Sequence, residues 1–103
     1  MAQVPELTIV RGGFAAEPVL LDAAARILGR AGDSDVLLDD VTVSPHHAQI
    51  RRTEDGGLEV RDLGSVNGTY VNGRRTDCCA LADGDELRIG AFRLCVHAHR
   101  RAS

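Results

Sequence analysis

Three short polar segments contain the residues of this sequence that are best suited to hold an anion. They are Gly29-Arg30, Ser44-Pro45-His46-His47 and Ser65-Val66-Asn67-Gly68. An arginine can donate two parallel N–H bonds to one phosphate, and a serine hydroxyl can donate a third. An asparagine amide can both donate to and accept from a peptide backbone. These groups are chemically suited to hold a phosphate and a neighbouring peptide backbone, and Arg30 is the strongest candidate phosphate ligand among them.

The proximity of Ser44 to His46 and His47 also allows a hydrolase with a serine nucleophile to be considered. Such catalysis needs a base in contact with the nucleophile, an acid that orients the base, and usually a strained strand–turn–helix element. The sequence around Ser44 contains no identifiable orienting acid and no such element. We therefore expect a binding protein and no enzyme, without catalytic residues and without a cofactor.

The cysteines and the last histidines give little basis for a metal site. Cys78 and Cys79 are adjacent, whereas zinc sites separate paired cysteines by about two to four residues, so we expect a loop of small residues there. Cys95 is expected to be a buried apolar residue of the last strand. His97 and His99 lack a third ligand, and a frayed tail is the expected structure around them. We expect no bound metal.

The elements that position these residues are expected to be short β-strands separated by Gly, Asp and Asn turns. The expected strands are residues 6–11, 18–21, 26–28, 36–38, 48–52, 58–61, 69–71, 86–89 and 92–96. Their regular spacing predicts an all-β fold, an antiparallel β-sandwich of about ten or eleven short strands. Loops of a sandwich gather at its two ends, so the three polar segments can meet on one rim.

Taken in order, these motifs resemble the forkhead-associated (FHA) domain. The resemblance runs from about Ile27 to Val96 and includes the Gly-Arg pair, the Ser-x-x-His box, the Asn-Gly-Thr-x-x-Asn-Gly run and residues 81–90. It implies that Arg30, Ser44 and Asn67 contact a phosphothreonine peptide. It also implies that Gly29, His47 and Gly68 shape the loops. A pocket for the threonine methyl group would then exclude phosphoserine.

Two positions depart from the usual pattern of this family. Pro45 stands where Arg or another polar residue is common, and proline has no N–H to offer. Val66 stands where Thr is frequent, so only its backbone N–H could reach a phosphate. His46 is a candidate replacement donor, because a nearby dianion favours its charged form. We therefore expect Pro45, His46 and Val66 to border the bound peptide, and Arg30 to carry an unusually large share of its affinity.

Composition narrows the class of partner. The formal net charge is −3, and all 12 basic residues are Arg, a balance that disfavours non-specific binding to nucleic acid. No apolar run approaches the length of a membrane span, and the first residues do not resemble a signal peptide. We expect a cytoplasmic monomer with three reduced cysteines. Residues 1–103 are expected to form one domain, with short flexible termini at 1–5 and 98–103.

Within the family, residues 38–44 and 68–72 are similar to those of small actinobacterial regulators of central metabolism. This similarity implies a role in bacterial Ser/Thr kinase signalling, with a phosphothreonine-containing kinase or kinase substrate as partner. Those regulators carry a phosphorylatable threonine in a long N-terminal tail. Here the first threonine is Thr8, inside the first expected strand, so self-inhibition by a tail is not expected. The alternative is a phosphate-independent interaction module that uses the same rim or a sheet face.

Overall fold

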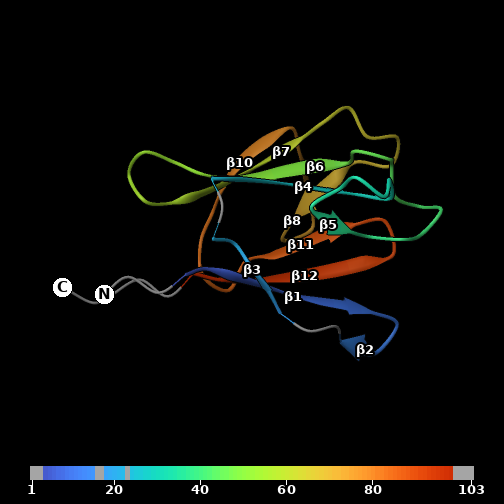
Figure 1. The fold of residues 1–103 in the computed structure, drawn as a ribbon, viewed down its shortest axis with the longest axis horizontal. Coiled ribbons are helices and arrows are strands. Elements are labelled where there is room, and N and C mark those ends of the chain that lie inside the picture. Colours follow the sequence, from blue (N-terminus) through green and yellow to red (C-terminus); the bar gives the residue numbers. More distant parts are fainter. Residues whose placement is uncertain (1–3, 16–17, 23, 99–103) are drawn as a thin grey trace.

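The computed structural model describes residues 4–15, 18–22 and 24–98, and this part of the chain contains strands and turns but no helix. Twelve strands are present in it (Figure 1). In chain order they are β1 (Glu6–Arg11), β2 (Phe14–Ala15), β3 (Val19–Leu20), β4 (Ala25–Gly29), β5 (Val36–Leu37), β6 (Ala48–Arg52), β7 (Leu58–Asp62), β8 (Thr69–Val71), β9 (Arg74–Thr76), β10 (Cys78–Leu81), β11 (Glu86–Ile89) and β12 (Phe92–His97).

The strands form two sheets that face each other. The larger sheet has the order β2-β1-β12-β11-β8-β9, with β3 also pairing with β1, and the smaller has the order β10-β7-β6-β4-β5. All pairs are antiparallel except β4 with β5, which are parallel. The predicted all-β sandwich is confirmed, with more strands than the ten or eleven expected, because the short strands β2, β9 and β10 give little local signal.

The core lies between the two sheets and is built by alternation along each strand. In β12 the side chains of Phe92, Leu94 and Val96 are buried, whereas Arg93 is exposed and Cys95 is half-buried. Leu87 of β11 and Ile50 of β6 are buried from opposite sheets. Each such leucine or isoleucine stabilises the fold by about 1.5–3 kcal/mol relative to an exposed position.

Three expectations about cysteine and histidine are wrong. Cys78 and Cys79 lie in strand β10 and not in a loop, because β10 pairs along its length with β7. Cys95 is half-buried, since its side chain alternates with those of the inward-facing residues of β12. His97 belongs to β12, where its Nε2 lies 2.9 Å from the Thr8 hydroxyl, and is not part of a tail. His99 lies outside the described residues.

The inner ends of both terminal segments contact the sandwich. The carbonyl of Pro5 accepts a hydrogen bond of 2.7 Å from Leu21 N. Ala98 N donates to Asp83 Oδ1 at 3.0 Å. Residues 1–3 and 99–103, to which the expectation of flexible termini also applies, lie outside the described residues.

The loops that carry the three polar segments gather at one end of the sandwich. This is the end opposite the β6–β7 turn at residues 53–57 (Figure 1). The loop after β4 and the loop before β6 belong to the smaller sheet, while the loop before β8 leads into the larger one. The rim is therefore assembled from both layers.

Candidate functional site

Gly29, the last residue of β4, allows two loop backbones to come into contact. A Cβ built on Gly29 would lie 2.0 Å from the carbonyl oxygen of Pro45, so no larger residue fits without moving the backbone. The contact is closed by two backbone hydrogen bonds, Arg30 N to Ser44 O at 3.1 Å and Ala31 N to Pro45 O at 3.0 Å. Arg30 is thereby held beside the segment that contains Ser44.

The guanidinium of Arg30 is oriented by the protein yet available to a ligand. Its Nε donates to the carbonyl of Val43 at 3.0 Å. Neither of its terminal Nη groups has a partner within residues 4–15, 18–22 and 24–98, and the residue is exposed. An arginine held in this way loses less side-chain entropy when its two free donors bind an anion.

His47 is fully buried and joins the Ser44 loop to the loop before β8. Ser44 N donates to its Nδ1 at 3.1 Å, so Nε2 carries the ring proton and donates to Gly68 O at 2.8 Å. Both ring nitrogens are thus used on backbone groups. His47 is a structural tie in this arrangement and has no free nitrogen to act as a base for Ser44.

The Ser44 hydroxyl is held by a backbone N–H from the facing loop. Its oxygen accepts a hydrogen bond of 3.0 Å from Val66 N, and its proton has no acceptor within the described part of the chain. This contact corrects the expected role of Val66, because its N–H orients the serine hydroxyl and is not free for a phosphate. The Val66 side chain is 83% exposed and borders the site.

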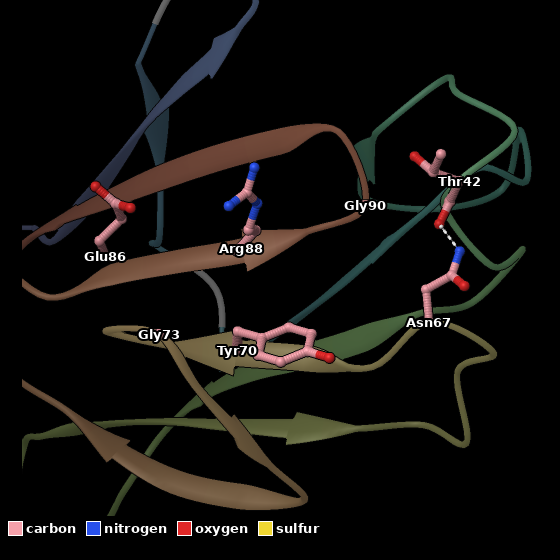
Figure 2. Close-up of a pocket in the computed structure, with 7 residues that line it drawn as sticks. All are labelled: Thr42, Asn67, Tyr70, Gly73, Glu86, Arg88 and Gly90. Carbon is pink, nitrogen blue, oxygen red and sulfur yellow. Dashed lines mark hydrogen bonds between the residues drawn. The ribbon is translucent and has the colours of Figure 1, made fainter.

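Asn67 is tied to the loop that precedes Ser44. Its Nδ2 donates to the carbonyl of Thr42 at 2.8 Å (Figure 2). Thr42 is in turn fixed from a third loop, since Ala91 N donates to its Oγ1 at 2.9 Å. The Asn67 side-chain oxygen has no partner within residues 4–15, 18–22 and 24–98. It is therefore free to accept from a peptide N–H.

His46 was the candidate replacement donor and Pro45 was expected to border the bound peptide, and both contact the loop that follows β4. His46 Nε2 lies 2.8 Å from Asp33 Oδ1, and the hydrogen bond and charge of His46 lower the pKa of the Asp33 carboxyl. Asp33 already occupies Nε2 of this histidine, so that nitrogen is not a free donor for the ligand. The Pro45 carbonyl accepts from Ala31 N and, at 3.2 Å, from Ser34 Oγ. Pro45 therefore acts through the loop scaffold.

Sequence reasoning did not identify Asp62 as the residue that organises the loop before β8. Its carboxylate accepts from Gly64 N and Ser65 N, each at 3.0 Å, and from the hydroxyls of Ser65 and Thr69. Partial burial alone would raise the pKa of Asp62, but these hydrogen bonds together hold it below the ordinary value. The Asp-x-Gly-Ser run that ends at Ser65 is a turn signal that could have revealed this role.

An open pocket of about 630 Å³ adjoins the Asn67 end of the site (Figure 2). It is lined by Thr42, Asn67, Tyr70, Gly73, Glu86, Arg88 and Gly90. Tyr70 comes from β8 and Glu86 and Arg88 from β11, so the pocket continues the rim onto the outer face of the larger sheet. The sequence interpretation missed it, because its two walls meet only through strand pairing.

The described residues offer neither a metal cluster nor a membrane-spanning helix. Residues 4–15, 18–22 and 24–98 contain no cluster of three or more metal-ligating side chains. The same ranges contain no helix long and apolar enough to cross a membrane.

Comparison with known proteins identifies relatives for this geometry. The family model for the FHA domain matches residues 26–90. The glycogen accumulation regulator GarA of Mycolicibacterium smegmatis is 51% identical over 88 residues, which are 85% of this chain and 55% of GarA. The chain thus spans about half the length of the curated relatives it matches.

Solved structures show the same likeness. A structure from an analysis of phosphothreonine-dependent FHA domain interactions superimposes with a TM-score of 0.81 at 31% identity, covering 93% of this chain and 99% of that one. EmbR of Mycobacterium tuberculosis, in complex with a low-affinity phosphopeptide, gives a TM-score of 0.81 at 32% identity. That match covers 97% of this chain and 26% of EmbR.

Proposed function

This chain belongs to the FHA domain family, and on that basis we propose that it is a module that binds phosphothreonine-containing segments of other proteins. The observation that carries the proposal is the guanidinium of Arg30, anchored through Nε to Val43 O with no partner for either Nη group among the described residues. On the adjoining loop, the Ser44 hydroxyl is held by Val66 N and keeps its proton to donate. Together these groups offer up to three hydrogen bonds to one phosphate dianion.

The second part of the site is suited to the peptide backbone. The Asn67 amide is fixed by its bond to Thr42 O, and its exposed oxygen can accept from an N–H of an extended peptide. Because Asn67 and Arg30 donate to the consecutive carbonyls of Thr42 and Val43, the phosphate and the neighbouring peptide backbone would be held close together on this rim. This spacing favours a short phosphorylated segment of a protein as the ligand.

The setting that we propose is regulation by a bacterial Ser/Thr kinase. The partner would be that kinase or one of its substrates, and the module would act in the cytoplasm as a monomer without catalysing a reaction. The phosphopeptide bound to EmbR and the regulatory role in the name of GarA support this setting. The use of both His47 nitrogens on backbone groups supports the absence of a hydrolase.

A second candidate function is phosphate-independent binding by the same rim. It is favoured by the small number of phosphate donors, since Val66 N is engaged, Pro45 has no N–H and His46 pairs with Asp33. Under this candidate a partner would bind equally well after phosphatase treatment. It would also bind equally well without the Arg30 guanidinium.

Fluorescence anisotropy with three labelled peptides of one sequence, bearing Thr, phosphothreonine or phosphoserine, separates the two candidates. The proposal predicts binding of the phosphothreonine peptide and about tenfold or more weaker binding of the phosphoserine peptide. Arg30→Ala should abolish detectable binding, because two charge-assisted bonds at about 1.5–3 kcal/mol each are lost. Arg52→Ala, an exposed arginine beside the turn at the far end, is the control. Equal affinity for the Thr and phosphothreonine peptides would refute the proposal.

A further inference from the structure

Three exposed arginines stand in line on the outer face of the larger sheet. Arg75 of β9 pairs with Tyr70 of β8, Tyr70 pairs with Arg88 of β11, and Arg88 pairs with Arg93 of β12. Residues at paired positions point to the same face of a sheet, so the four side chains form one row across four neighbouring strands. We call Arg75, Arg88 and Arg93 the arginine row.

No ion pair neutralises the arginine row within the part of the chain that the structure describes. Within the described residues none of its members has an ion pair, whereas Arg11, Arg26 and Arg51 pair with carboxylates of the chain. Like charges directly opposite each other destabilise a sheet, and Arg88 lies directly opposite Arg93. Glu86, on the same face of β11, makes no ion pair with Arg88. The chain as a whole has a net charge of −3, so the arginine row is a local positive patch on a negatively charged protein.

The arginine row is continuous with the candidate phosphate site. The Arg75 side chain lies over Gly68, where an added Cβ would come within 2.8 Å of Arg75 Nε. Gly68 directly follows Asn67. The 630 Å³ pocket likewise runs from Thr42 and Asn67 to Arg88 (Figure 2). A ligand held at Arg30 and Asn67 can therefore extend onto the arginine row without leaving the surface.

We propose that the arginine row binds an acidic segment of the same protein that presents the phosphothreonine. This inference rests on the proposed function and adds a second contact to it. Three strand spacings of about 4.8 Å separate Arg75 from Arg93, so the row spans roughly 14 Å, the length of about four extended residues. From Asn67 to Tyr70 the backbone covers about 10 Å. The acidic segment would thus begin about three residues from the phosphothreonine.

Two sets of four peptides test this, each set with all combinations of Thr or phosphothreonine and a neutral or a four-Glu tract placed three residues away. Both an N-terminal and a C-terminal placement of the tract are made. At 50 mM salt the tract on one side is expected to raise phosphopeptide affinity about tenfold, as for a few exposed ion pairs. At 300 mM salt most of this gain should disappear through screening.

The variant Arg88→Gln/Arg93→Gln should lose the gain from the tract and keep its affinity for the phosphopeptide with the neutral tract within about twofold. Arg52→Gln, an exposed arginine on β6 of the other sheet, should keep the gain. Circular dichroism verifies that both variants are folded. No gain from either placement, or a gain that survives in the double variant, would overturn the proposal.

The same peptides also separate this inference from the function on which it rests. If phosphorylation has no effect with either tract, the proposed function fails. If phosphorylation matters and the tract does not, only the acidic segment fails. In the last experiment, a labelled single-stranded oligonucleotide replaces the peptide as the ligand. Binding of that oligonucleotide through Arg88 and Arg93, without any gain from the acidic tract, would show that the row serves nucleic acid and overturn the proposal.

Discussion

The substitution His47→Ala should destabilise the protein more than any change to an exposed residue of the rim. It removes the bonds from Ser44 N to Nδ1 and from Nε2 to Gly68 O, at 3.1 and 2.8 Å, around a side chain with 0% exposure. Leaving a buried donor or acceptor unsatisfied costs about 1–3 kcal/mol. With two groups affected, we expect a loss of about 3 kcal/mol in the free energy of unfolding. This is a large fraction of the roughly 5–15 kcal/mol available to a domain.

Urea unfolding followed by far-UV circular dichroism measures this loss, since the chain has no Trp and one Tyr. The slope of the transition should be unchanged while its midpoint falls. The neighbouring His46→Ala is the matched control, because His46 is exposed and its ring bonds to the exposed Asp33. Its midpoint should stay close to that of the wild type. A loss below about 1 kcal/mol for His47→Ala would refute the reasoning that His47 ties the two loops together.

Three further predictions follow from single contacts. Gly29→Ala should lower the melting temperature strongly in differential scanning calorimetry, because the new Cβ would lie 2.0 Å from Pro45 O, and an unchanged value would contradict that backbone contact. Ser44→Ala should weaken phosphopeptide binding about tenfold in calorimetric titration, by loss of one donor to a charged group, with little change in stability. Asp62 has a lowered pKa in the folded state, so its stabilising contribution is present above its ordinary value of 3.8 and lost as pH falls below it. The difference in urea midpoint between wild type and Asp62→Asn should therefore shrink from pH 7 to pH 3, and a constant difference would argue against this role.

The features that were predictable from sequence are those with a local signal. Alternation of apolar and polar residues indicated β12, and the turn residues at 53–57 indicated the hairpin of β6 and β7. Strand β10 was missed because it lies at a sheet edge, where Cys78 and Ala80 are exposed and Leu81 is the one buried residue of the strand. Edge strands need little apolar surface, so their sequences resemble loops.

The polar groups of the rim were identified, but not all of their roles. Val66 and His46 were expected to face a phosphate, yet each contacts a residue that is distant in sequence, Ser44 and Asp33 respectively. Such pairings depend on how loops from different strands meet, and a local pattern carries no information about them. The same holds for the arginine row, which exists only through the register of four strands.

The hydrogen bonds between the loops join the two layers of the sandwich at the rim. The loop that contains Ser44 leads into β6 of the smaller sheet, and the loop that contains Gly68 leads into β8 of the larger one. A ligand that contacts both Arg30 and Asn67 would therefore add a further link between the two sheets. By linkage, a peptide present at about 100 times its Kd would add about 2.7 kcal/mol to the resistance of the whole domain to unfolding. A force applied to the bound peptide would act on the packing between the two sheets. The force needed to detach the peptide would therefore depend on the stability of the core.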